Sequence, residues 1–285
     1  MWTPEMDMGR SKRVMQRATS AMERGKDRLR KMAARALHTI ALSDDTLIYR
    51  YVSAEVFLSM IERQENLLAH ISRWEDPFEG FVFRGEALEV EPINDPSVNV
   101  ARRDLYRNYF GQSWTLCDKD SDLRWRAYCP HRDGVRITST VGRLKRNFIG
   151  QSKQSLVAAS HFDNVYYFNR DDLQKISKQK VMEADGGFEM LFVKSVEFDE
   201  EQEYRIVVDA SLLHNVMAQK GMRIENGFLK YPLGVIDGKG NQRALFDEIL
   251  LDPRMDVLAV ERLKSRVAQS GARLAVRQSQ AYKWE

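Results

Sequence analysis

The sequence has 285 residues, 43% of them hydrophobic and 30% charged, with a formal net charge of +3. This composition is typical of a globular chain that is long enough to bury a full core. No run of about 18 apolar residues occurs, so we expect no membrane-spanning segment, and the N-terminal charges are not followed by the apolar stretch of a secretory signal. Because the only cysteines, Cys117 and Cys129, form no C-x-x-C pair, we expect a reducing, cytoplasmic environment.

The positive charge is concentrated at the beginning of the chain, where lysine and arginine outnumber the acidic residues over positions 10–36. Residues 11–40 contain no proline and place apolar side chains near one helical face. We therefore predict a basic helical N-terminal arm over residues 1–43 and a core domain over residues 44–285. The arm either binds a protein, a nucleic acid or an acidic membrane surface, or packs on the core as a solvated amphipathic helix.

The predicted core begins with a β-branched and aromatic strand at residues 46–52, followed by a helix that Ser53 caps and that runs to Gln64. Further strands are predicted at residues 66–71, 109–116, 134–138, 165–168, 203–209, 244–251 and 273–277. Further helices are predicted at residues 122–128, 141–148, 171–179, 188–193 and 257–269. Strands and helices mix without regular βαβ alternation, which predicts an α+β fold with mixed or antiparallel sheets and packed helices.

Several well-known site motifs are absent from the sequence. It contains no P-loop, no glycine-rich dinucleotide fingerprint, no H-E-x-x-H and no nucleophile elbow. The five histidines are scattered, and Cys129-Pro130-His131 has no second ligand pair to complete a zinc site. We therefore predict no metal site.

Tyr49-Arg50-Tyr51 is the first candidate site. Side chains alternate along a strand, so Arg50 points away from both rings. It either reaches solvent or lies in a cleft, where its planar fork suits phosphate or ribose oxygens.

Ser113-Trp114-Thr115 is the second candidate site. It places two hydroxyl groups on one face of a strand, with the indole on the other. The hydroxyls orient a ligand or a carboxylate, or they simply form a polar strand face.

Glu201 and Glu203 form the third candidate site. If they begin a strand, their carboxylates share a face about 7 Å apart. They are either a solvated acidic strand end or a functional pair.

The aromatic segments at 74–79 and 125–128 either line a pocket or pack the core.

Taken together, these motifs resemble the bacterial family known as domain of unknown function 2971. The resemblance extends over residues 47–284 and is carried, in order, by residues 49–53, 74–79, 113–115, 125–128, 131–135, 201–205 and 248–251. Glu75 stands where the family usually has asparagine before Asp-Pro-Phe-Glu. The family name itself implies no activity.

The sequence also resembles arginine-type ADP-ribosyltransferases, which have an early strand arginine after a tyrosine, a central serine-x-threonine strand and a late glutamate-x-glutamate pair. This resemblance implies an ADP-ribosyltransferase-like fold, with NAD as the substrate and an unidentified protein or nucleic acid as acceptor. Glu203 and Glu201 would be catalytic. The residues that would bind NAD are Tyr49, Arg50, Tyr51, Ser113, Trp114 and Thr115. Tyr51 stands where that family often has glycine.

The implied chemistry suits these residues, because cleavage of the nicotinamide–ribose bond develops positive charge on the ribose. Glu203 would stabilise that charge and Glu201 would activate the acceptor. Arg50 would bind phosphate or ribose, Ser113 would orient Glu203, and Tyr51 or Trp114 would stack on nicotinamide. By analogy, such an enzyme serves as a toxin or a phage-defence effector.

Two other functions remain open from the sequence. One is a non-catalytic module that recruits a partner through the basic arm. The other is a Mg²⁺-dependent nuclease, for which the candidate ligands are Asp76, Glu79, Glu201 and Glu203.

Overall fold

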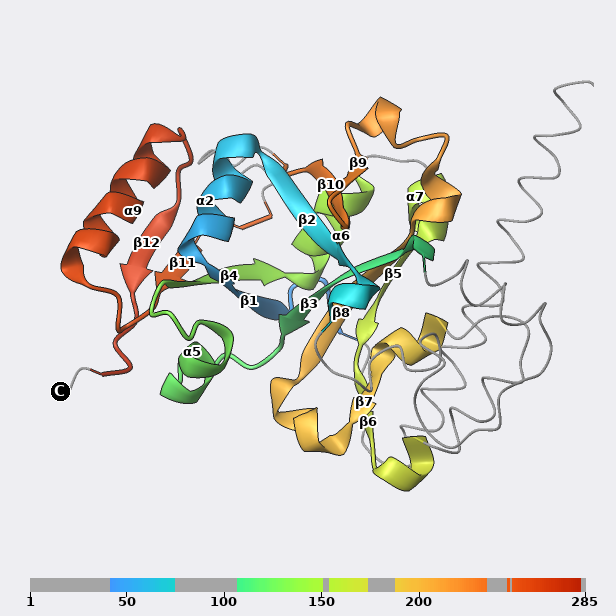
Figure 1. Cartoon of the computed structure of the whole chain (residues 1–285), viewed down its shortest axis with the longest axis horizontal. Helices are drawn as coiled ribbons and strands as arrows, with labels where there is room; N and C mark the ends of the chain where they lie inside the picture. Colours follow the sequence, from blue (N-terminus) through green and yellow to red (C-terminus); the bar gives the residue numbers. More distant parts are fainter. Residues whose placement is uncertain are drawn as a thin grey trace, which may run out of the picture. The chain divides into compact units, whose positions relative to one another are not determined.

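The computed structural model describes residues 42–74, 107–150, 154–173, 188–234, 245–246 and 248–282 (Figure 1). Nearly all of the predicted N-terminal arm therefore lies outside the described residues, as do positions 75–79 of the tryptophan motif. The chain divides into two compact units. Unit 1 holds the described residues within 69–112 and 153–216, and unit 2 holds those within 42–68, 113–152 and 217–285. A single core domain over residues 44–285 stays a prediction.

Unit 2 is built on a mainly antiparallel sheet. Strand β1 (Leu47–Ser53) pairs along its whole length with β4 (Gly134–Thr140), and β4 pairs on its other edge with β11 (Glu248–Leu251). The parallel neighbour of β11 is β12 (Ala275–Gln278), and β1 also pairs with β3 (Tyr109–Thr115) through Tyr49 and Thr115. Strand β10 (Phe228–Pro232) pairs antiparallel with β9 (Arg223–Glu225) and belongs to the same sheet, where its other neighbour is β2 (Glu65–His70). The short helix η5 spans Ala218–Lys220.

The helices of unit 2 begin at residues that cap them. Ser53 accepts a hydrogen bond from the Val56 amide at the start of α2 (Ala54–Arg63), and Asp256 caps α9 (Val257–Gln269) in the same way. Gln64 ends α2 in a left-handed conformation. Two shorter helices, α5 (Asp122–Tyr128) and α6 (Val141–Ile149), flank β4 in sequence.

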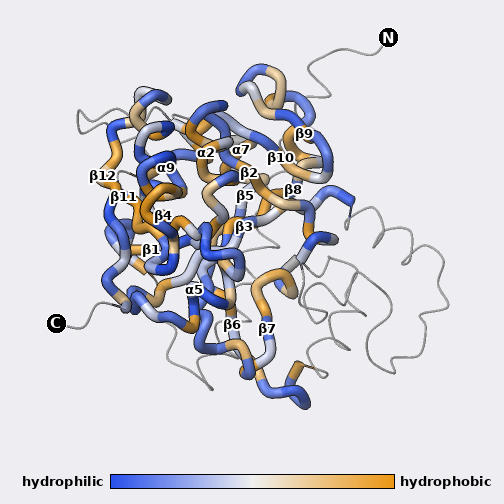
Figure 2. The backbone as a smooth tube through the Cα atoms, turned by 60° about the vertical axis from the view of Figure 1, so that its left-hand side comes forward, coloured by the Kyte–Doolittle hydropathy of each residue, from blue (hydrophilic) through white to orange (hydrophobic). Residues whose placement is uncertain are grey.

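The core of unit 2 comes from alternate positions of its strands and from the apolar faces of its helices. Val135, Ile137 and Ile249 have no exposed surface, and β4 and β11 accordingly carry hydrophobic stretches in Figure 2. Helix α2 contributes Phe57, whose ring lies 5.9 Å from that of Phe246. This core holds β1, with Arg50 at its centre, in a fixed register.

In unit 1, strand β5 (Ser160–Asn164) pairs antiparallel with β8 (Glu203–Asp209), and β8 also pairs with β3. Strand β2 (Glu65–His70) pairs with β3 through Ala69 and Gly111. A second, two-stranded parallel sheet joins β6 (Tyr166–Phe168) to β7 (Val193–Ser195). The helical segments of unit 1 are short: α7 (Gln154–Ala159), η1 (Ile71–Arg73), η2 (Phe188–Phe192), η3 (Val196–Glu201) and η4 (Ala210–Leu213).

The predicted α+β class is confirmed by this arrangement. The helices expected at 122–128 and 257–269 and the strand expected at 203–209 have the predicted bounds. Four of the described strands, β5, β7, β9 and β10, were not predicted, and residues 188–192 form a 3₁₀ helix. Of the helix expected at 171–179, only the first residues are described. None of the described helices is both long and apolar enough to cross a membrane.

Candidate active site

Four charged side chains of unit 1, Lys194, Glu201, Glu203 and Arg205, form one hydrogen-bonded group, which we call the Lys194 cluster. Three of them are buried and Glu201 is half-buried. The Lys194 Nζ atom donates to Glu201 Oε2 at 2.6 Å and to Glu203 Oε1 at 2.9 Å. The Arg205 Nε atom donates to the other carboxylate oxygen of Glu203, Oε2, at 2.6 Å. Two carboxylates therefore share one ammonium group, and one of them also binds a guanidinium.

The two-stranded sheet of unit 1 positions this cluster. Lys194 in β7 is the register partner of Tyr167 in β6. The hydroxyl oxygen of Tyr167 accepts a hydrogen bond from the backbone N–H of Glu203 at 2.9 Å. Two paired positions of this sheet thus hold Glu203: Tyr167 binds its backbone amide, and Lys194 binds its carboxylate.

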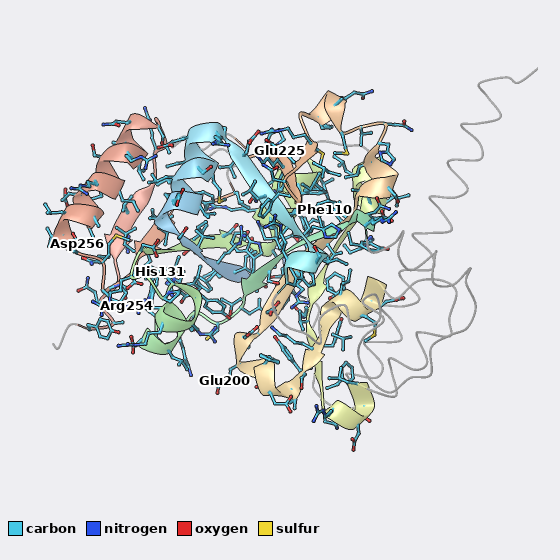
Figure 3. The ribbon with its side chains drawn as sticks, viewed as in Figure 1. Phe110, His131, Glu200, Glu225, Arg254 and Asp256 are labelled. Carbon is cyan, nitrogen blue, oxygen red and sulfur yellow. The ribbon has the colours of Figure 1, made fainter. Side chains whose placement is uncertain are left out.

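The path of the chain between the two glutamates differs from the strand that we expected. Glu201 is the last residue of η3, and only Glu203 lies in a strand. Gln202 between them has a left-handed backbone with a φ of 46°. The carboxylates meet because the chain turns at Gln202 and Lys194 binds both, and not because they alternate along one strand face. Figure 3 labels the exposed neighbour Glu200, which belongs to the same η3 segment.

Arg205 is held on several sides. Its side chain is 1% exposed, and its Nη1 atom donates to the Leu191 carbonyl oxygen at 2.7 Å. Its guanidinium lies 4.7 Å from the ring centre of Trp74, a stacking arrangement that favours a cation. A Cβ atom on Gly111 would lie 2.5 Å from the Trp74 ring, so glycine at this position leaves room for the indole. Trp74 thereby contributes to the site through Arg205.

Burial and neighbouring charge push the pKa values of the two carboxyls apart. Burial alone would raise the pKa of Glu203, but attraction to Arg205, with hydrogen bonds from Glu201 and Arg205, holds that pKa well below its usual range. Burial, followed by the hydrogen bond to Glu203, raises the pKa of Glu201 to about 7 despite the opposing effect of Lys194. A pair of carboxyls with separated pKa values is a common arrangement for acid and base chemistry near neutral pH.

In unit 2, the side chains of β1 alternate as predicted. The Arg136 guanidinium lies over the Tyr49 ring, 4.8 Å from the ring centre. Tyr51 meets Trp125 edge to face at 4.9 Å and stacks on Tyr128 at 5.4 Å. These contacts attach Tyr51 to α5, and its predicted stacking on nicotinamide stays a prediction.

The buried Nη1 atom of Arg50 is placed to donate a hydrogen bond to an anionic ligand. Among the described residues, no hydrogen-bond acceptor contacts its buried Nη1 atom. Burial lowers the pKa of Arg50 to about 10, opposed by the nearby Tyr231, so the guanidinium remains charged at neutral pH. The Tyr231 hydroxyl oxygen accepts a hydrogen bond from the Asn66 side chain at 2.7 Å.

The predicted residues of β3 lie in different surroundings. Trp114 is 2% exposed and belongs to the core, whereas Ser113 is half-buried. The Thr115 hydroxyl oxygen accepts from the Cys117 amide at 3.1 Å and from Arg124 Nη1 at 3.3 Å. Thr115 thus has a local structural role, and the predicted orientation of Glu203 by Ser113 stays a prediction.

Sequence reasoning missed Lys194 and did not assign a role to Arg205. The signal for Lys194 was a single lysine directly after the apolar run at residues 190–193, a position that is unusual unless the charge is paired. Among the described residues, no group of three histidine, cysteine or acidic side chains is arranged to hold a metal ion. Asp76 and Glu79, the other candidate Mg²⁺ ligands, lie outside those residues.

A family model described as "Protein of unknown function (DUF2971)" matches residues 124–206, which include the whole Lys194 cluster. The resemblance to this family is confirmed over that stretch. No curated protein matches the chain.

Solved structures of DarT from Thermus sp. 2.9 are similar to this chain at 11% identity. The complex with ADP-ribosylated ssDNA has a TM-score of 0.38 and covers 86% of this chain and 99% of the DarT chain. The complex with NAD+ has a TM-score of 0.37 and covers 86% of this chain and 100% of the DarT chain.

Proposed function

We propose that the protein transfers ADP-ribose from NAD to a protein or nucleic-acid acceptor, with Glu203 and Glu201 as the catalytic pair. The observation that carries this proposal is the glutamate-x-glutamate pair, in which the half-buried Glu201 and the buried Glu203 bind the same Lys194 ammonium group at 2.6 and 2.9 Å. The order of the sequence motifs, which resembles that of arginine-type ADP-ribosyltransferases, supports the assignment of NAD as the substrate.

The proposed reaction breaks the bond between the ribose C1′ atom and nicotinamide, and nicotinamide leaves with the bonding electron pair. The ribose becomes cation-like in the transition state, as in glycoside cleavage. An ionised Glu203 stabilises this charge and accepts a hydrogen bond from a ribose hydroxyl. The acceptor then forms a bond to C1′ and gives up a proton, which Glu201 receives in its ionised form.

Arg50 is the residue that we propose to bind the phosphates of NAD. Its buried Nη1 atom has no acceptor among the described residues, and a cation with an unused donor gains most from an anionic ligand. We further propose that Tyr49, Tyr51, Ser113, Trp114 and Thr115 contribute to NAD binding, as the resemblance implies.

The test uses purified protein and NAD labelled in its adenylate group, with cell lysate and total RNA as sources of acceptor. Wild type is compared with Glu203→Gln and with the control Glu200→Gln, which alters an exposed neighbour in η3. Nicotinamide release and label transfer that disappear in Glu203→Gln and persist in Glu200→Gln support the proposal. The labelled fraction identifies the acceptor class.

A folded wild-type protein that consumes no NAD with any acceptor would overturn the proposal and favour the binding module. Deletion of residues 1–36 would then be the next variant to examine.

We propose the cytoplasm as the site of action, where the free thiols Cys117 and Cys129 stay reduced. A toxin or phage-defence role, tested by the growth of cells that express wild type or Glu203→Gln, remains part of this proposal.

A further inference from the structure

Lys194 binds both glutamates, which also hydrogen-bond to each other. Its Nζ atom lies within hydrogen-bonding distance of both carboxylates, and the Arg205 Nε atom donates to Glu203. We propose that Lys194 is a positioning residue whose ammonium group holds Glu201 and Glu203 together as one reacting pair. This inference rests on the proposed function, because it assigns Lys194 a role in that reaction.

The surroundings of Lys194 suit a fixed contact better than a mobile surface one. Its side chain is 6% exposed, so solvent competes little for its hydrogen bonds. Lys194 also belongs to the ladder that anchors the Glu203 amide through Tyr167. The ammonium group therefore has a defined position relative to the Glu203 backbone.

Lys194 also makes two contacts with η3, the segment that carries Glu201. Its Nζ atom lies 4.7 Å from the ring centre of Phe198, and it donates to Glu201 at 2.6 Å. Without this cation, two adjacent carboxylates would repel each other, and Arg205 would neutralise only one of them. The expected consequence is that Glu201 moves away from Glu203 or stays protonated to a higher pH.

The first experiment measures the pairing without reference to any activity. The carboxyl carbons of ¹³C-labelled glutamate are followed by NMR as the pH is changed, in wild type, Lys194→Met and the control Lys264→Met. Lys264 is an exposed helix residue that contacts only Glu261 among the described ion pairs. Signals are assigned with Glu201→Gln and Glu203→Gln. In Lys194→Met we expect the midpoint of Glu201 to rise by about 1 pH unit or more, because a cation within hydrogen-bonding distance is lost.

The second experiment measures the reaction. Removal of Lys194 should reduce kcat for NAD consumption by about 10²-fold, a typical effect for losing a positioned acid or base. The KM for NAD should change less than about threefold, because a positioning residue acts on the transition state and not on ground-state binding. The acidic limb of the kcat profile should move to higher pH together with the NMR midpoint. Lys194→Arg keeps the charge and should retain part of the activity and a midpoint near that of wild type.

The outcomes separate this inference from the proposed function. A shifted Glu201 midpoint in a protein that consumes no NAD would support the pairing and overturn the ADP-ribosyl transfer proposal. If wild type is active, and folded Lys194→Met has the same Glu201 titration midpoint and the same acidic limb of the kcat profile, the positioning role alone is overturned. If Lys194→Met does not fold, Lys194→Gln and Lys194→Arg are compared instead. An equal midpoint and equal kcat in those two variants would contradict the inference.

Discussion

Among the described residues, each unit contains a cluster of ion pairs with buried members, and the two clusters are built differently. In unit 2, Asp252 has no exposed surface, and Arg254 binds its two carboxylate oxygens at 2.9 and 2.6 Å. The Arg254 Nη2 atom also donates to the carbonyl oxygens of Trp125 and Cys129, at the end of α5 (Figure 3). One acid meets one base, and the Nη2 atom that binds Asp252 also donates to the end of a helix.

In the Lys194 cluster of unit 1, acids compete for the same donor. Glu201 and Glu203 share one ammonium group, and Glu203 also binds the Arg205 guanidinium. The Asp252–Arg254 pair therefore has the arrangement expected of a structural clamp, whereas the Lys194 cluster leaves one carboxyl with a proton that it can exchange near neutral pH. Both clusters contain buried charge and equal numbers of acids and bases. They differ because one ammonium group of the Lys194 cluster binds two carboxylates, whereas Arg254 binds one.

The largest expected effect is at Glu203. We predict that Glu203→Gln lowers kcat/KM for NAD consumption by about 10³-fold, because a neutral amide cannot stabilise positive charge on the ribose. Steady-state nicotinamide release measures this, with Glu200→Gln as the control within twofold of wild type. Equal loss in both variants would show that the acidic segment, and not the paired carboxylate, matters.

Breaking the clamp of unit 2 should affect stability instead. Arg254→Leu leaves the buried Asp252 carboxylate without its partner and should lower the free energy of unfolding by about 3–5 kcal/mol. Urea denaturation followed by circular dichroism measures the change. Arg266→Leu, which removes an exposed ion pair with Glu62, should cost less than about 1 kcal/mol. Similar losses in the two variants would contradict the structural reading of Arg254.

The next effect concerns pH. The pKa of Glu201 is about 7, and the base form is the ionised one. Transfer of ADP-ribose should therefore increase as the pH rises through about 7 and level off above it. Glu201→Gln should lower kcat by about 10²-fold and abolish this limb. A limb that persists unchanged in Glu201→Gln would assign the titration to another group.

The smallest expected effect is at Gly111, which lies against the Trp74 indole that stacks on Arg205. Gly111→Ala would place a methyl group against Trp74 and also 3.1 Å from the Ile206 carbonyl oxygen. We expect a loss of about 1–3 kcal/mol in unfolding free energy from overpacking, with a lower kcat because Arg205 shifts with the ring. Combining it with Trp74→Leu should restore part of the stability. Failure of that double variant to recover would show that the backbone contact dominates.

Local signals in the sequence were sufficient for part of the fold. Asp256 as a cap and the apolar spacing that follows it predict α9, and the alternation after Glu203 predicts β8. Strand β5 escapes prediction because serine, histidine, aspartate and asparagine dominate it, and its pairing with β8 is a long-range effect.

The candidate site was predicted only in part, for a related reason. Glu201, Glu203 and Arg50 stand out by residue type and spacing. Lys194 does not stand out, because its position in the site depends on the parallel pairing of β6 with β7. The turn at Gln202 was also missed, since glutamine carries no preference for a left-handed backbone.

The left-handed Gln202 has a consequence for which sequences can carry this site. Most residues with a Cβ atom pay about 1–2 kcal/mol in that conformation, whereas glycine adopts it freely and asparagine tolerates it better than other side chains. Backbone shape therefore favours glycine or asparagine at the middle position of glutamate-x-glutamate. A saturation library at position 202, sorted for folded protein, should return glycine and asparagine most often and valine and isoleucine least. Enrichment of β-branched residues would mean that the turn is not kept in solution.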